Sequence, residues 1–258
     1  MAKIIAVHSY KGGTGKTSMS VNLAATLAKN GKKVCLFDLD FRAPSLFAIL
    51  KAKNVEFWLN DYLNSTCEIN KAIIDLSDRV SGGKFYACLA NPSTEAIRDI
   101  SSKDRKWEMR ALGRLLALRD TLLRDQKFDY LVFDTSPGLQ YSSINAIVAA
   151  DFVVVATTGD RSDVDGTKRM LAELYNLFEK KTGLVLNKVL DPSATSRKTE
   201  VAAKVKADYQ VPLLGIVPCF CEILRAEGNF IFVQDKPDHP FTKIVAEMVK
   251  RIENDEVN

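Results

Sequence analysis

The sequence predicts an α/β fold: a doubly wound, mostly parallel β-sheet with helices on both faces. Short runs rich in β-branched residues alternate with helical patterns along the 258 residues, as in chains built from βαβ units. A glycine-rich turn joins the first apolar run to a helix. Aspartates follow two of the later apolar runs, at the carboxyl edge where parallel sheets bind ligands.

Seven strands are expected, one for each short apolar or β-branched run: residues 4–7, 33–37, 84–89, 130–133, 152–157, 184–187 and 213–217. The first helix is expected over Thr17 to Asn30, because apolar residues recur there at helical spacing and Gly31 supplies a stop. Residues 52–102 are the least regular part of the sequence, and insertions or partner-specific surface are expected there.

A long helix is expected over residues 104–125. Its apolar residues recur at helical spacing and are expected to face the core: Met109, Leu112, Leu115, Leu116 and Leu122. Arginines flank this stripe, and a solvated helix face is favoured over a DNA-binding surface. The last helix, residues 240–252, carries a stripe of its own, for which core packing is favoured over a membrane anchor.

The composition is that of one globular domain, residues 1–258. Hydrophobic residues make up 47% of the chain and charged residues 26%, enough for one substantial core. The net charge of +4 permits weak nonspecific DNA binding without indicating it. No signal peptide and no integral membrane segment are expected. Five cysteines without framework spacing fit a reducing, cytoplasmic environment.

Residues 8–18, HSYKGGTGKTS, follow an apolar run and open a helical pattern, which is the context of a phosphate-binding P-loop. Backbone N–H groups of such a loop face the phosphates of ATP, while a lysine neutralises them and a hydroxyl binds Mg²⁺. Lys16 and Thr17 take those two places. Tyr10 stands where the common form has glycine, and Lys11 is a second lysine. The expected nucleotide-binding residues are Lys11, Gly12, Gly13, Thr14, Gly15, Lys16, Thr17 and Ser18.

Three carboxylates are expected at the same edge of the sheet. Asp38 ends the second strand, Asp40 lies in the loop beyond it, and Asp134 ends a strongly apolar strand. Bound Mg²⁺ needs acids nearby, and a hydrolytic water needs a group that holds it. Each aspartate alone fits a strand-end turn or a helix cap equally well, but the three together favour a nucleotide site.

Four motifs in this order resemble the deviant Walker A ATPases of the ParA/MinD family: KGGTGKTS, DLD, DTSPG and LVLNK. The resemblance spans about Met1 to Lys250 and implies a P-loop NTPase fold of the SIMIBI type. It also implies a slow, partner-stimulated Mg-ATPase that forms a homodimer in the ATP state. In that family the lysine matching Lys11 crosses the dimer interface to the partner's phosphates, while Lys16 serves its own nucleotide.

The resemblance implies further roles, residue by residue. Asp40 matches the acid that positions the attacking water, and Asp38 and Asp134 match acids near Mg²⁺. Asn187 matches an adenine-side residue, and Pro218 matches a proline that lines the base pocket. The expected catalytic residues are therefore Lys11, Lys16 and Asp40, and the expected Mg²⁺ site is Thr17, Asp38 and Asp134.

The subfamily is marked by three segments. Residues 42–45, RAPS, depart from the run typical of the ParA branch, whereas DTSPGLQYSS and GNFIFVQDKP look closer to the MinD branch. The expected function is a cytoplasmic switch that positions a cargo and needs an activating partner.

Two other functions stay open. A metallocofactor carrier would hold an iron–sulfur cluster or nickel between two subunits through Cys219 and Cys221. A small-molecule kinase or an amidoligase-like enzyme would use the same P-loop. His8 and His239 are too far apart in context to suggest a zinc site and are expected to be structural.

Overall fold

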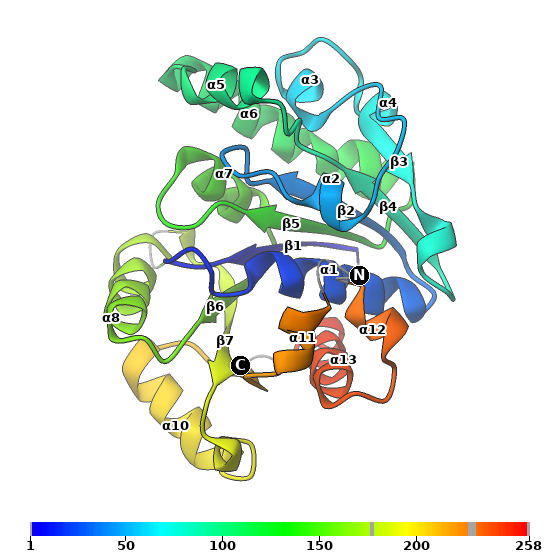
Figure 1. Ribbon diagram of the computed structural model, residues 1–258. Helices are drawn as coiled ribbons and strands as arrows, with labels where there is room; N and C mark the ends of the chain where they lie inside the picture. Colours follow the sequence, from blue (N-terminus) through cyan, green and yellow to red (C-terminus); the bar gives the residue numbers. More distant parts are fainter. Residues whose placement is uncertain (1, 176–177, 227–230, 257–258) are drawn as a thin grey trace.

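A computed structural model describes residues 2–175, 178–226 and 231–256. One sheet of eight strands runs through them in the order β3-β4-β2-β5-β1-β6-β7-β8 (Figure 1). The strands are β1 (Lys3–His8), β2 (Lys33–Leu39), β3 (Ile73–Asp75), β4 (Lys84–Cys88), β5 (Tyr130–Thr135), β6 (Phe152–Thr157), β7 (Lys181–Val189) and β8 (Leu213–Pro218). All seven expected strands are confirmed. The short edge strand β3, which pairs antiparallel with β4, was not predicted.

Helices cover both faces of the sheet (Figure 1), as the predicted doubly wound fold requires. They are α1 (Lys16–Lys29), α2 (Leu46–Ile49), α3 (Leu59–Leu63), α4 (Ile69–Ala72), α5 (Thr94–Ser101), α6 (Arg105–Leu118), α7 (Tyr141–Ala149), α8 (Arg161–Met170), α10 (Lys198–Tyr209), α11 (Cys221–Arg225), α12 (Phe232–Asp235) and α13 (Pro240–Glu253). No helix in these described ranges is long and apolar enough to cross a membrane.

Successive side chains of each central strand pack on opposite faces of the sheet, which divides the core into two clusters. On β1, Ile4 and Ala6 pack into a cluster with residues of α6, α7 and α8. Ile5 and Val7 pack into the other cluster, with residues of α1, α12 and α13. Since successive side chains of a strand point to opposite faces, the central strands read as continuous apolar runs buried on both sides.

The first and last helices form as predicted. Helix α1 begins one residue before the expected start, and Gly31 follows it with a φ of +83°, a left-handed conformation that favours glycine. The apolar face of α13 is buried, which confirms core packing for this helix. Residues 228–230 of the segment GNFIFVQDKP lie outside the described residues, and α12 forms within the rest of it.

The predicted buried stripe of the long helix is partly wrong. Met109 is 63% exposed and Leu116 46% exposed. The buried face is instead formed by Trp107, Ala111, Leu115 and Leu118. Trp107 determines which face of the helix is buried, because its indole N–H donates to the side-chain oxygen of Asn64 at 2.8 Å. Beyond Leu118 the helix continues in the wider π form over Arg119–Asp125.

The adjacent leucines of α6 give a matched test of this corrected face. Leu115→Ala should lower the free energy of unfolding by about 2–5 kcal/mol, because it leaves a cavity in the core. Leu116→Ala removes the same atoms from a half-exposed position and should change stability by less than about 1 kcal/mol. Urea unfolding of the two variants measures both values, and equal losses would contradict the assigned face.

Candidate functional site

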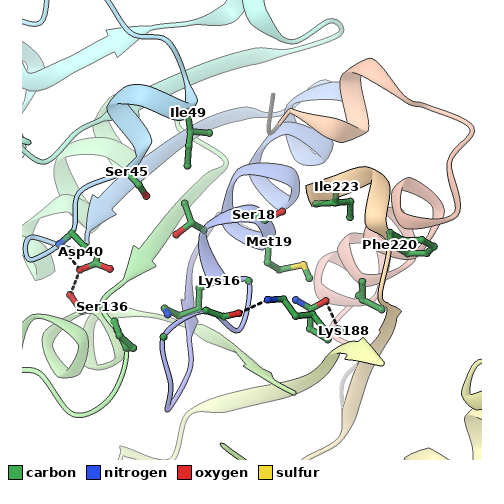
Figure 2. Close-up of a pocket in the computed structure, with 18 of the residues that line it drawn as sticks. Lys16, Ser18, Met19, Asp40, Ser45, Ile49, Ser136, Lys188, Phe220 and Ile223 are labelled. Atoms are coloured by element: carbon green, nitrogen blue, oxygen red, sulfur yellow. Dashed lines mark hydrogen bonds between the residues drawn. The ribbon is translucent and has the colours of Figure 1, made fainter. Parts of the chain in front are cut away.

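The glycine-rich loop between β1 and α1 opens onto a cavity of about 790 Å³ (Figure 2). The backbone of the loop is left-handed at Gly13 and Gly15, with φ values of +75° and +94°. No acidic residue stands in the first turn of α1, so the free N–H groups there can meet an anion. The part of the loop and helix that lines the cavity is Gly12, Gly13, Gly15, Lys16, Thr17 and Ser18. A cavity of this size accommodates a small-molecule ligand.

Two residues at the end of β7 hold the loop from outside. The side-chain amide of Asn187 donates to the Thr14 carbonyl at 2.7 Å, and the ammonium group of Lys188 donates to the Gly13 carbonyl at 2.7 Å. A Cβ atom on Gly15 would lie 2.3 Å from the side-chain amide nitrogen of Asn187, so a larger residue at position 15 would clash with Asn187. Asn187 thus supports the loop as well as lining the cavity. Lys188 was not predicted as a site residue, although it ends the LVLNK motif.

The far end of the cavity is apolar. Its lining includes Met19, Ile49, Val217, Pro218, Phe220, Ile223 and Phe241. Pro218, expected beside the base of a nucleotide, lies in this part, where a flat and weakly polar ring system would bury apolar area. His239 stacks edge-on against Phe220 with ring centroids 4.8 Å apart. Its Nδ1 accepts the N–H of Phe241 at 3.1 Å and caps α13, so His239 has a structural role.

Asp38 and Asp134 lie side by side on the paired strands β2 and β5, and neither is exposed. The two oxygens of Asp38 accept the N–H groups of Asp40 and Leu46, at 3.1 and 3.2 Å. Burial and the neighbouring charge of Asp134 raise the pKa of Asp38 well above its usual range. Asp38 therefore also shapes the loop that carries Asp40.

Asp134 has one oxygen to spare. Oδ1 accepts the hydroxyl of Ser20 at 2.9 Å, while the buried Oδ2 has no hydrogen-bond partner among the described residues. Burial raises the pKa of Asp134 to about 6, although the neighbouring hydroxyls of Thr17 and Ser20 and the charge of Lys16 act against the shift. An unsatisfied carboxylate oxygen beside the hydroxyl of Thr17 is a donor set that suits Mg²⁺.

Asp40 lies across the cavity from Lys16 and joins two loops (Figure 2). Its Oδ1 accepts the hydroxyl of Ser136 at 2.9 Å and the N–H of Ala43 at 3.3 Å. Ser136 begins the turn after β5, so the position of Asp40 depends on that turn. Ser136 and Ser20 were not predicted as site residues, although Ser136 lies within the DTSPG motif.

Lys16 is surrounded by acids. The residue is 6% exposed, and burial lowers the pKa of its ammonium group against the attraction of Asp134, Asp40 and Asp163. Asp163, which the sequence analysis missed, is fully buried in the first turn of α8. Its Oδ2 accepts the N–H of Thr158 at 2.7 Å and its Oδ1 has no partner within the described ranges. Its place just after the carboxyl end of β6 is the signal that could have found it.

Lys11 points to a different element. Its ammonium group binds the carboxylate of Asp160 at 2.9 Å and also the hydroxyl of Ser162. Asp160 is the N-cap of α8 and also accepts the hydroxyl of Ser162 at 2.6 Å. The hydrogen bonds from Ser162 and Lys11 hold the pKa of Asp160 well below its usual range. The side chain of Lys11 is 45% exposed. The two lysines of the loop are therefore separated, one buried among carboxylates and one on the surface.

The two cysteines of the predicted metal pair, Cys219 and Cys221, are both exposed. Cys219 also lines the apolar end of the cavity. Over the described part of the chain, no group of three or more histidine, cysteine, aspartate or glutamate side chains is arranged to hold a metal ion.

Known proteins share this architecture. A family model described as an AAA domain matches residues 2–191. A septum site-determining protein MinD of Synechocystis is 31% identical over 93% of this chain and 85% of its own length. An uncharacterized ATP-binding protein of Methanocaldococcus jannaschii is 28% identical over 98% of this chain and 88% of its own. The solved structure of MinD from Pyrococcus horikoshii, complexed with Mg-ADP, superposes with a TM-score of 0.78, 22% identity, and coverage of 99% and 98%.

Substitution of Asp134 tests how much the buried charge of this residue destabilises the nucleotide-free protein. Its pKa is raised from 3.8 to about 6, so between these values the folded protein binds the proton more tightly than the unfolded chain. Its contribution to stability is present below pH 4 and is lost as the pH rises through 6. The free energy of unfolding of Asp134→Asn, relative to that of the wild type, should therefore rise by about 3 kcal/mol between pH 3.5 and pH 7.

Urea unfolding of nucleotide-free protein across this pH range measures the difference. Asp120→Asn, at an exposed position, is the control for loss of a surface carboxyl group. A difference between Asp134→Asn and the wild type that stays constant with pH would show that Asp134 does not carry the buried charge.

Proposed function

This chain belongs to the ParA/MinD family of P-loop ATPases, and we propose that it is an ATP-dependent dimerising switch that hydrolyses Mg-ATP to position a cargo. The observation that carries the proposal is the common cavity of the glycine-rich loop, Lys16 and Asp40, with Asp134 buried beside it. Its polar end suits phosphates and its apolar end suits a base. The two ends together match the chemistry of a nucleotide.

The proposed hydrolysis divides the work among residues of this chain. The loop N–H groups and Lys16 bind the phosphates and balance their charge. Thr17 and Asp134 would hold Mg²⁺, which neutralises charge on the phosphate oxygens when bound. Asp40 orients the water that attacks the terminal phosphorus and accepts its proton, and ADP leaves. Asp38 keeps the loop of Asp40 in place through the two hydrogen bonds described above.

Dimerisation is proposed from the surface around Lys11. This lysine is bound to Asp160 and Ser162 on its own chain, and an exposed ion pair of this kind is weak enough to exchange. Leu139 and Tyr141, which follow the turn after β5, are 52% and 57% exposed. A second copy placed against this face would cover both side chains and offer phosphates to Lys11.

The partners and location follow from the same proposal. A protein activator would speed a slow ATPase, and the ATP dimer would act in the cytoplasm. The small net charge of +4 supports only weak nonspecific DNA binding, which salt would weaken further. A metallocofactor carrier remains the alternative, because Cys219 and Cys221 are exposed. Stoichiometric metal in anaerobically purified dimer would favour the carrier, and its absence would favour the switch.

Two substitutions should have opposite effects on the switch. Lys11→Ala removes the positive charge proposed to reach the partner's phosphates and leaves Lys16 in place, so this variant should bind Mg-ATP as a monomer and fail to dimerise. Asp40→Ala keeps the phosphate contacts but removes the group that orients water, so its ATP dimer should persist while hydrolysis falls at least about 100-fold. Light scattering with Mg-ATP reports the masses, and phosphate release reports turnover.

Lys103→Ala, which removes a partly exposed lysine that pairs with Asp99, is the control for loss of one positive charge. An ATP-dependent dimer of Lys11→Ala would refute the crossing role. Unchanged turnover in Asp40→Ala would refute the role of that carboxylate.

A further inference from the structure

A buried histidine joins three elements behind the candidate site. His8 is the last residue of β1 and is not exposed. Its Nδ1 lies 2.8 Å from the hydroxyl of Tyr175, and its Nε2 lies 2.8 Å from the carbonyl oxygen of Gly138. Tyr175 ends the π-helical continuation of α8, Leu171–Tyr175. Gly138 lies in the turn after β5.

The two contacts fix the protonation of the ring. A carbonyl oxygen only accepts, so Nε2 carries the proton and donates to Gly138. Nδ1 is then the acceptor for the Tyr175 hydroxyl. Burial lowers the pKa of His8 to about 4 and raises the pKa of Tyr175 well above its usual range. Both groups therefore stay neutral at physiological pH, and the direction of the two hydrogen bonds is defined.

The turn that receives this hydrogen bond also holds Asp40. The N–H of Gly138 donates to the Ser9 carbonyl at 2.9 Å. The backbone N–H and carbonyl groups of Gly138 are therefore both hydrogen-bonded, to Ser9 and His8 respectively. Gly138 has a φ of +73°. Glycine adopts this left-handed conformation at little cost because it has no side chain, and the two hydrogen bonds hold it there. Two residues earlier, the hydroxyl of Ser136 binds Asp40. A chain of contacts thus runs from α8 to the carboxylate proposed to orient water.

We infer that His8 and Tyr175 are positioning residues for hydrolysis: they hold the turn of residues 136–138, and through it Asp40, in the orientation that turnover needs. Neither residue lines the cavity, so they should act on the rate of the chemical step and not on nucleotide affinity. The same contact makes this turn responsive to α8, whose N-cap Asp160 binds Lys11. The kinetic part of the inference rests on the proposed ATPase function.

Tyr175→Phe removes one hydroxyl from this chain and keeps the ring. It should lower kcat for ATP about five- to tenfold, the effect of one lost hydrogen bond, and leave KM within about twofold. His8→Leu removes both hydrogen bonds and should lower kcat further. His8→Gln keeps an amide donor for Gly138 and should recover most of the activity. Tyr62→Phe is the matched control, since it removes a buried hydroxyl bonded to the Arg114 carbonyl, away from the site.

A second readout does not depend on turnover. Amide hydrogen exchange in nucleotide-free protein should be faster at Gly138 in Tyr175→Phe and His8→Leu than in the wild type, and unchanged in Tyr62→Phe. The nitrogen resonances of the His8 ring should show a protonated Nε2 and an acceptor Nδ1. Circular dichroism and Mg-ATP affinity show that each variant is folded.

The outcomes separate the two proposals. A wild-type protein that does not hydrolyse ATP would contradict the proposed function, and the exchange data would still decide whether His8 and Tyr175 hold the turn. An active wild type, with kcat unchanged in Tyr175→Phe and His8→Leu, would overturn the inference. So would unaltered exchange at Gly138, or a fall of kcat in Tyr62→Phe equal to that in Tyr175→Phe.

Discussion

The candidate site depends on one crowded electrostatic arrangement, the ammonium group of Lys16 among buried carboxylates. Taking a charge out of water is costly, and an opposite charge nearby offsets that cost. Here the acids outnumber the lysine: Asp134, Asp40 and Asp163 all act on it. Without a ligand, burial raises the pKa values of Asp38 and Asp134, and the charges of neighbouring aspartates add to both shifts: Asp134 and Asp40 act on Asp38, and Asp40 acts on Asp134. The excess of buried negative charge makes a bound cation favourable, and the excess of free loop N–H groups makes a bound anion favourable.

The rest of the fold brings these groups to one edge and keeps the loop open. Parallel pairing places Asp38 beside Asp134, and the loops that follow β1, β2 and β5 line the same cavity. The loop itself has little structure of its own, and the amide of Asn187 and the ammonium group of Lys188 hold it from β7. Binding groups that are already in place lose less entropy when a ligand arrives.

Sequence reasoning predicted the groups that regular patterns mark. The seven longer strands, α1 and the buried face of α13 follow from period and composition, and the loop residues and three aspartates follow from their positions after strands. It failed where a single tertiary contact decided the outcome. Trp107 and its hydrogen bond to Asn64 set the face of α6, so Met109 and Leu116 face solvent although their spacing favoured the core. His8 and Lys188 act through partners more than 100 residues away, and Ser136 acts through Asp40, 96 residues away. The motifs DTSPG and LVLNK contain Ser136 and Lys188, but a motif does not indicate which distant group its side chains contact.

The unusual Tyr10 of the loop has a physical explanation in α8. A Cβ atom on Gly166 would lie 2.0 Å from Cε1 of Tyr10, so the tyrosine ring occupies the space that a side chain on α8 would need. Tyr10 and Gly166 are thus complementary, and either change alone would cause a clash or a cavity. Helix α8 and its extension therefore meet three residues of one four-residue stretch: Tyr175 meets His8, Gly166 meets Tyr10, and Asp160 meets Lys11. The contact of His8 is buried and Tyr10 packs against the core, so the helix and its extension cannot shift there without moving the loop, because packed interiors transmit strain. The third contact, the exposed ion pair of Lys11, can exchange. Different elements therefore hold the two halves of the loop: β7 bonds to the half next to Lys16, and α8 contacts the half that carries Lys11.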